Sequence, residues 1–133
     1  MQRDVVLLIL FDQEGRFLLQ HRDETAPTYG GYWGFFGGGV EDGETPEKAV
    51  QREAFEELRY SPLNLVPRLV ISYRDEKQNR HGTKYYFSEL CSCKSGMELH
   101  EGQGMGWFSV SELANLKMTP SNRSILEKLA TQI

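Results

Sequence analysis

Three glutamates lie close together near the middle of the chain, at Glu53, Glu56 and Glu57. In a helix these three side chains share one face within a single turn. Carboxylates at this density repel one another, and Arg52, four residues before Glu56, offsets only part of the repulsion. Their oxygens suit a hard divalent cation such as Mg2+ or Mn2+. The alternative is a solvated acidic face of a surface helix, which is what most runs of charge are.

A glycine-rich loop leads into this acidic stretch. Residues 37–43 are GGGVEDG, and Thr45 and Pro46 follow shortly after. Thr45 is a suitable N-cap, and Pro46 fits the first helical position, where its missing N–H costs nothing. Lys48 stands where a capping box would have a glutamate, so we expect a simple cap. The pattern predicts a glycine-rich loop joined directly to the helix that carries the carboxylates.

Six residue types stand at the spacing of a known motif: Gly38, Glu44, Arg52, Glu53, Glu56 and Glu57. With each type at roughly 7 % of average composition, a chance match arises about once in ten million starting positions. The stretch resembles the Nudix box of the Nudix hydrolases, Gx5Ex7REUxEExGU. The closing glycine of that box is Arg59 here. Such a glycine would end the helix in a left-handed residue, so the resemblance does not fix how this helix ends.

The resemblance implies a role for each charged residue of the box. Glu56 and Glu57 are metal ligands, and Glu53 is a further ligand or the catalytic base. Arg52 pairs with these glutamates and orients them. Glu44 steadies the junction of loop and helix and can reach the metal through a water molecule. The implied cofactor is Mg2+, with Mn2+ as a substitute.

Residues outside the helix complete the implied site. Gly37 and Gly38 let phosphate and metal approach the backbone, and the Gly37 carbonyl can itself be a ligand. The EGQ at residues 101–103, followed by Trp107, resembles a segment of MutT-type 8-oxo-dGTP pyrophosphohydrolases. The glutamate of that segment binds metal, so the resemblance gives this role to Glu101. Glu98 fits a solvated loop acid better.

Candidate substrate contacts come from four places in the chain. Asn122 matches an asparagine with which MutT-type enzymes hydrogen-bond the purine base, although it could equally be a local helix cap. The lysine that follows the glycines in those enzymes is Gly39 here, so a cation near the phosphates is missing. Arg22 either replaces part of this charge or is an exposed strand-end residue. We take Tyr85 as a ring that stacks on the base, from four aromatic candidates that otherwise belong to the core: Trp33, Phe35, Tyr73 and Tyr85.

The apolar pattern predicts the elements that position these residues. The continuous apolar run at 5–11 predicts a central strand. Further strands are predicted at 16–22, 32–36, 63–73, 84–93 and 104–109, with a polar loop at 23–31 and a mobile polar connection at 74–83. Short helices should begin near Ser109 and at Thr119-Pro120. The pattern indicates an α/β protein with a mixed sheet. The resemblance implies the Nudix fold, an α/β/α sandwich, as a single domain over residues 1–133.

Composition limits the classes of partner. With 15 basic and 19 acidic residues, the net charge of −4 offers no electrostatic footprint for duplex nucleic acid. No apolar run is long enough to span a membrane, and the first residues lack a signal-peptide pattern. Cys91 and Cys93 alternate along one predicted strand and make a poor disulfide framework. We therefore expect a cytoplasmic protein with reduced thiols.

The expected function is Mg2+-dependent hydrolysis of a nucleoside diphosphate linked to a further group. The favoured substrate is a nucleoside triphosphate, including an oxidised purine such as 8-oxo-dGTP, cleaved to the monophosphate and pyrophosphate. Alternatives are a pyrophosphatase of nucleotide sugars or dinucleoside polyphosphates, and a non-catalytic nucleotide sensor, which usually has a broken box. An isoprenoid diphosphate isomerase would need a cysteine at the site. The sequence does not decide between a monomer and a homodimer.

Overall fold

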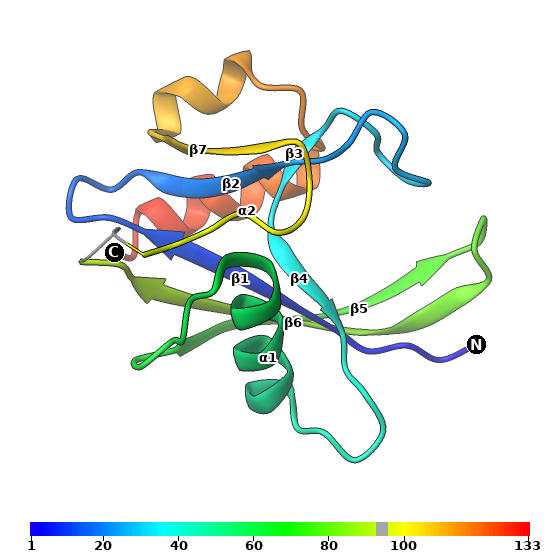
Figure 1. Cartoon of the computed structure of the whole chain (residues 1–133). Helices are drawn as coiled ribbons and strands as arrows, with labels where there is room; N and C mark the ends of the chain where they lie inside the picture. Colours follow the sequence, from blue (N-terminus) through cyan, green and yellow to red (C-terminus); the bar gives the residue numbers. More distant parts are fainter. Residues whose placement is uncertain (93–95) are drawn as a thin grey trace.

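A single mixed sheet organises the chain, and its two faces are covered by helices (Figure 1). The computed structural model describes residues 1–92 and 96–133. In chain order its elements are β1 (Val5–Phe11), β2 (Phe17–His21), β3 (Trp33–Gly34), β4 (Phe36–Gly39), α1 (Pro46–Leu58), β5 (Val66–Asp75), β6 (Arg80–Leu90), β7 (Gly104–Phe108), the 3-10 helix η1 (Val110–Asn115) and α2 (Pro120–Ala130).

The strand β1 lies at the centre of the sheet, as its unbroken apolar sequence predicts. The order is β3-β2-β1-β6-β5, while β4 also pairs with β1 and β7 with β2. β1 runs parallel to β6, from Val5 opposite Lys84 to Phe11 opposite Leu90. It runs antiparallel to β2 and β4. The predicted mixed sheet is therefore confirmed.

Alternation along β1 sends its side chains into two separate cores. Val6, Leu8 and Leu10 pack with buried residues of α1 on one face. Ile9 packs on the other face with Leu126 and other buried residues of α2 and η1. Figure 1 shows α1 in front of the sheet and α2 behind it. The α/β/α sandwich expected from the sequence is thus confirmed, and it places the C-terminal part of α1 beside β4.

Residues 74–83 differ from the prediction of a mobile connection. They form the outer part of the β5–β6 hairpin, in which Asp75 pairs with Arg80 around a short turn. Asn79 enters the turn with φ of 51°, a left-handed value that asparagine tolerates well. The polar sequence misled the prediction because this part of the hairpin extends beyond the core, where a strand needs no apolar face.

Smaller differences concern the ends of strands. The predicted strand 32–36 is interrupted at Phe35, which separates β3 from β4. The predicted strand 84–93 ends at Leu90, followed by the buried Cys91, while Cys93 lies outside the described residues. Neither α1 nor α2, the α-helices of the described ranges, has the length and apolar character needed to cross a membrane.

Candidate active site

The glycine loop enters the site through β4, where Gly37 lies opposite Leu7 of β1. A Cβ at residue 37 would stand 2.0 Å from the Val6 carbonyl oxygen, and φ is 150°, so only glycine fits. The close approach lets the Gly37 N–H donate a hydrogen bond of 3.0 Å to Oε2 of Glu57. The loop is therefore tied directly to an acidic side chain of α1.

The helix α1 begins as the sequence predicts. The Thr45 hydroxyl accepts a 3.2 Å hydrogen bond from the Lys48 N–H, and Pro46 is the first helical residue. Burial of its apolar side fixes the rotation of the helix against the sheet, through Ala49, Val50, Ala54 and Leu58. This rotation puts Glu53 under the loop, because a Cβ at Gly38 would lie 2.4 Å from Oε1 of Glu53. Glycine at 38 thus leaves room for the carboxylate.

Arg52 is the hub of the acidic residues. Its Nε and Nη2 donate to the two carboxylate oxygens of Glu44, at 2.8 and 3.0 Å, and Nη2 also donates to the Gly39 carbonyl at 2.9 Å. Its Nη1 donates to Oε1 of Glu53 at 2.9 Å and to Glu56 at 3.3 Å. The hydrogen bonds with Glu44 raise the pKa of Arg52 and lower the pKa of Glu44 to about 2. Both groups therefore stay charged and hold the loop to the helix.

Glu57 is the most deeply buried acid of α1, with 4 % of its surface exposed. Burial, together with the nearby carboxyl groups of Glu101 and Glu53, raises the pKa of Glu57 to about 10 against the opposing bond from Gly37. Glu101 lies within hydrogen-bonding reach of Glu57, so the two distant parts of the sequence meet here. Burial also raises the pKa of Glu53, although its pairing with Arg52 opposes the shift. The cluster thus holds carboxyl groups where water cannot stabilise their charged forms.

The donor set of this cluster fits a hard divalent cation. Glu53, Glu57 and Glu101 offer carboxylate oxygens, which Mg2+ and Mn2+ prefer, and a cation would relieve the mutual repulsion that raises their pKa values. In the described ranges no three His, Cys, Asp or Glu side chains already stand in a metal-holding arrangement. Glu101 is exposed and next to Glu57, so its carboxyl group must turn for all three to share an ion.

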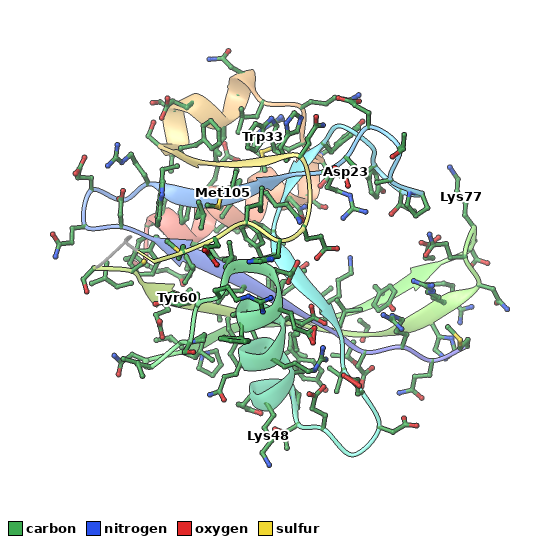
Figure 2. The ribbon with its side chains drawn as sticks, in the orientation of Figure 1. Asp23, Trp33, Lys48, Tyr60, Lys77 and Met105 are labelled. Atoms are coloured by element: carbon green, nitrogen blue, oxygen red, sulfur yellow. The ribbon has the colours of Figure 1, made fainter. Side chains whose placement is uncertain are left out.

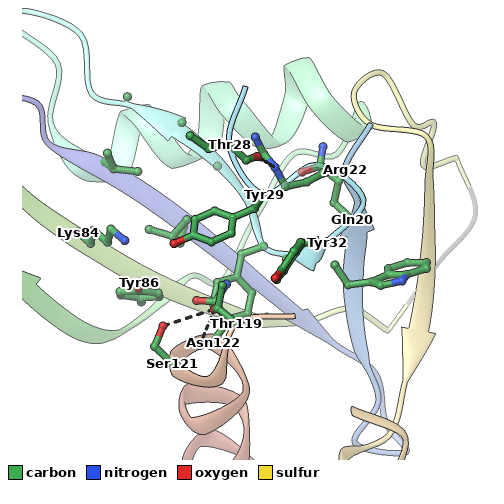
Figure 3. Close-up of a pocket in the computed structure, with 18 of the residues that line it drawn as sticks. Gln20, Arg22, Thr28, Tyr29, Tyr32, Lys84, Tyr86, Thr119, Ser121 and Asn122 are labelled. Atoms are coloured by element: carbon green, nitrogen blue, oxygen red, sulfur yellow. Dashed lines mark hydrogen bonds between the residues drawn. The ribbon is translucent and has the colours of Figure 1, made fainter. Parts of the chain in front are cut away.

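A pocket of about 380 Å3 opens beside the cluster. Its acidic end contains Glu57 and Glu101, and the three glycines of the loop form part of its wall. Polar groups come from Asn122 and neighbouring residues at the start of α2, and rings come from the segment 29–35. Figure 3 shows Tyr29, Tyr32, Asn122 and Lys84 around this space. An acidic end, a glycine wall and an aromatic, amide-bearing part together suit a nucleotide.

The structure brings six of the predicted site residues to the pocket: Gly37, Gly38, Glu57, Glu101, Arg22 and Asn122. Arg22 donates through Nε to the Thr28 carbonyl at 3.0 Å, so its guanidinium is oriented by the neighbouring loop. Asn122 lies in the first turn of α2, where its N–H donates to the Thr119 hydroxyl at 3.2 Å. Its side-chain amide therefore remains available to the pocket while Thr119 caps the helix.

Five predicted residues do not line the pocket: Glu44, Arg52 and Glu53 belong to the network beside it, and Tyr85 and Glu56 lie elsewhere. Tyr85 packs against the core beside α1 and does not line the pocket, whereas Tyr86 does. Neighbouring residues of a strand point to opposite faces, so the expectation for Tyr85 was wrong by one position. The Glu56 side chain is 53 % exposed and has only a long contact with Arg52. It lies outside the buried cluster, so as a ligand it would have to reach the metal from the rim.

Several contributors were not expected from the sequence. Glu41 forms an ion pair of 3.0 Å with Nε of Arg52, and only its place in the glycine loop hinted at this. Tyr29 lines the pocket from the predicted polar loop 23–31, and Tyr32 lines it from the start of the predicted strand 32–36. Trp33, one of the four aromatic candidates from the sequence, also lines the pocket, and it stacks on His21 with ring centroids 4.3 Å apart (Figure 2 labels Trp33). Trp33 thus has one face already occupied.

Comparison with known proteins agrees with this site. The chain is 27 % identical to the nucleoside triphosphatase NudI of Salmonella agona, over 95 % of this chain and 96 % of that protein. It is 27 % identical to the CTP pyrophosphohydrolase of Escherichia coli, over 92 % and 87 % of the two chains. It also spans 24 % of a longer nucleoside triphosphate pyrophosphatase/Nudix hydrolase fusion protein of Bifidobacterium longum, at 26 % identity.

Solved structures share the fold. The MutT Nudix hydrolase of Burkholderia pseudomallei superposes with a TM-score of 0.80 at 26 % identity, covering 96 % of this chain and 97 % of that one. The Nudix domain of Shewanella oneidensis NrtR, solved with ADP-ribose, gives a TM-score of 0.81 at 16 % identity, over 99 % and 88 %. The NUDIX domain family model matches residues 1–129. The chain therefore belongs to the Nudix family and is a Nudix hydrolase.

Proposed function

We propose that this chain is a Mg2+-dependent pyrophosphohydrolase that cleaves nucleoside triphosphates to the monophosphate and pyrophosphate. The observation that carries the proposal is the single pocket that joins Glu57 and Glu101 to the glycine loop and to the amide of Asn122. Relatives that match nearly the whole chain are named a nucleoside triphosphatase and a CTP pyrophosphohydrolase, which favours a triphosphate. Oxidised purine nucleotides remain within this class.

The chain's residues have distinct tasks in this reaction. Glu53, Glu57 and Glu101 hold the ion, which when bound neutralises phosphate charge and lowers the pKa of water. Glu53, half-buried and with its pKa raised, also suits the role of base towards the attacking water. Arg52 keeps Glu53 in place. The glycine backbone lets the phosphates lie close to these groups, which positions the bond for in-line attack.

The alternatives are less well supported by the same pocket. A nucleotide sugar or dinucleoside polyphosphate would also present a diphosphate to the acids, and product analysis separates these substrates. A purely sensing module would not need the intact network around Arg52. For an isoprenoid diphosphate isomerase, Cys91 is the only described cysteine, and it is buried in the core outside the pocket. A homodimer and a cytoplasmic location stay predictions from the sequence.

The test replaces the two buried acids singly. Glu53→Gln and Glu57→Gln should each lower kcat on the best nucleotide by on the order of a thousandfold or more, because each removes charge from the reacting end. The assay is a panel of nucleoside triphosphates and nucleotide sugars with Mg2+ or Mn2+, with products identified by mass. Glu47→Gln, an exposed acid of the same helix, is the matched control. Near-normal turnover by either site variant, or products other than monophosphate and pyrophosphate, contradicts the proposal.

A further inference from the structure

Besides Arg22, three cations line the pocket where β1 and β6 begin. They are Arg3 before β1, Arg80 at the start of β6 and Lys84 further along β6. None of the three forms an ion pair with an acid in the described part of the chain. Lys84 has its Nζ 5.1 Å from the ring centre of Tyr73, and Figure 3 shows its amine directed towards the pocket. Unpaired cations gathered in a pocket of an acidic protein indicate an anionic ligand.

The backbone of Arg3 is held firmly although its side chain is exposed. Its N–H donates to the His81 carbonyl at 2.8 Å, and its own carbonyl accepts a bond of 2.5 Å from the Tyr73 hydroxyl. Gly82 permits this close pairing, because a Cβ there would lie 2.4 Å from the Arg3 carbonyl oxygen. The neighbouring Asp4 carbonyl accepts the Val40 N–H at 2.9 Å, which fixes this strand end against the glycine loop. Arg3 is thus anchored between β6 and the loop before any ligand binds.

The guanidinium of Arg3 fills the place that a side chain at residue 39 would take. A Cβ on Gly39 would stand 2.5 Å from Nη2 and 2.6 Å from Cζ of Arg3. Gly39 is also the position at which the sequence lacks an expected cation. The missing charge at this position of the glycine loop is therefore supplied from the start of the chain. Glycine is needed here because a longer side chain would displace the guanidinium.

We propose that Arg3, with Lys84 and Arg80, binds the distal phosphates of the nucleoside triphosphate and so selects it over a nucleotide whose diphosphate carries a neutral group. The inference rests on the proposed function and names the part of the pocket that recognises the triphosphate. The pocket runs from Glu57 past Gly38 and Gly39 to Arg3. Phosphates that lie along the glycines would therefore end at these three cations, where charge-assisted hydrogen bonds hold them.

The first test compares two substrates. Arg3→Gln and Lys84→Gln should each lower kcat/KM for the nucleoside triphosphate by about tenfold, as loss of one charge-assisted phosphate contact does, and change it less than about twofold for a nucleotide sugar. Lys48→Gln is the matched control, since Lys48 points outward from the first turn of α1 (Figure 2). Equal losses on both substrates mean that Arg3 and Lys84 serve only the fold, which overturns the proposal.

A rescue variant tests the position of the charge. In Arg3→Gln, a second change Gly39→Lys places an ammonium group on the loop, where the guanidinium stood. The ratio of kcat/KM for the triphosphate to that for the nucleotide sugar should return to within about threefold of its value in the original protein. The reason is that phosphate binding needs a positive charge at this point, whichever residue carries it. Gly39→Ala alone should push the guanidinium away and behave like Arg3→Gln. A folded double variant that stays as impaired as Arg3→Gln contradicts the assignment.

Metal-free binding separates this inference from the proposed reaction. Inorganic tripolyphosphate, titrated by calorimetry into the protein in EDTA, should bind the original chain and bind Arg3→Gln about tenfold more weakly. If the chain hydrolyses no nucleoside triphosphate but Arg3→Gln still binds tripolyphosphate more weakly than the original chain, the proposed reaction is wrong. Anion binding by Arg3, Arg80 and Lys84 is then still supported. If Arg3→Gln and Lys84→Gln bind tripolyphosphate as tightly as the original chain does, these residues do not bind phosphates, whichever substrate the enzyme hydrolyses.

Discussion

At the scale of single residues, Glu57 is held where its charge is least favourable. It is almost fully buried, and its carboxyl group faces those of Glu101 and Glu53 with only the Gly37 N–H to stabilise the anion. A chain selected for stability alone would place an uncharged group there. Glu53, by contrast, has the guanidinium of Arg52 at 2.9 Å and needs less compensation. The buried acid is therefore a cost to the fold that a bound cation would offset.

The cost can be measured as a pH-dependent difference in stability. The pKa of Glu57 is about 10 in the folded chain, against 4.5 for the free side chain. Between these values the folded state binds one more proton than the unfolded state, so the free energy of unfolding falls as pH rises. Glu57→Gln lacks this titration. In EDTA its Tm should exceed that of the original chain, by a margin that grows from pH 5.5 to pH 8.5.

Thermal unfolding followed by circular dichroism measures this margin directly. Each kcal/mol gained should raise Tm by roughly 3–6 °C for a chain of this size. Glu47→Gln, an exposed acid on the same helix, should show no such trend with pH. A Glu57→Gln protein that is less stable than the original chain above pH 7 would mean that the ionised carboxylate is well solvated after all.

At the scale of the element, α1 has a well-capped N-terminus and a strained C-terminus. Thr45 and Pro46 form its start, but its C-cap Arg59 has φ of 53° in the left-handed region. The N–H groups of Arg59 and Tyr60 still reach the carbonyls of Phe55 and Ala54. The Arg59 guanidinium bonds the Phe55 carbonyl at 3.2 Å and lies 5.0 Å over the Phe55 ring. These exposed contacts offset part of the backbone strain.

Arg59→Gly should stabilise the chain by about 0.5–1 kcal/mol, because glycine adopts the left-handed cap without a Cβ clash. The gain remains positive after the loss of the exposed contacts with Phe55, which are worth a few tenths of a kcal/mol. Urea unfolding at constant m-value gives the measurement. Arg59→Ala keeps the strain and loses the contacts, so it should destabilise. If glycine also destabilises, the side-chain contacts outweigh the strain.

Sequence could predict α1 because a helix brings together residues of fixed spacing. The relation between Arg52, Glu53 and Glu56 therefore follows from the order of the residues. The sequence predicts less about strands, because the face of the sheet that a strand residue occupies depends on partners far away in the sequence. Tyr85 was misplaced by one position for this reason. The contact of Arg3 with Gly39 arises only from the pairing of β1 with β4, which no local pattern near residue 3 indicates.

At the scale of the whole molecule, groups of opposite charge line one pocket. Glu57 and Glu101 line it near Gly37, and Arg3, Arg80 and Lys84 line it nearer the start of β1 and β6. The register of β1 and β4 keeps these groups apart, since Gly37, which bonds Glu57, lies opposite Leu7, whereas Gly39, beside Arg3, lies opposite Val5. A polyphosphate that extends from these cations to the acids would meet repulsion at the acidic end, which a bound cation would relieve. For the proposed reaction, we therefore expect a chain with a net charge of −4 to need a metal ion at the acidic end when the bond to be cleaved lies there.

Divalent cations should consequently stabilise the whole domain even without substrate. At a Mg2+ concentration ten times its dissociation constant, the folded state gains about 1.4 kcal/mol through linkage, seen as a higher Tm. Because Mg2+ must replace the proton on Glu57, whose pKa is about 10, the gain should increase from pH 6.5 to pH 9. Mn2+ should act at lower concentration than Mg2+, since nitrogen and oxygen ligands bind transition-metal ions more tightly. Glu57→Gln should lose most of the shift and Glu47→Gln should keep it. If neither ion changes Tm at any pH, the buried acids do not form a cation site, and their burial needs another explanation.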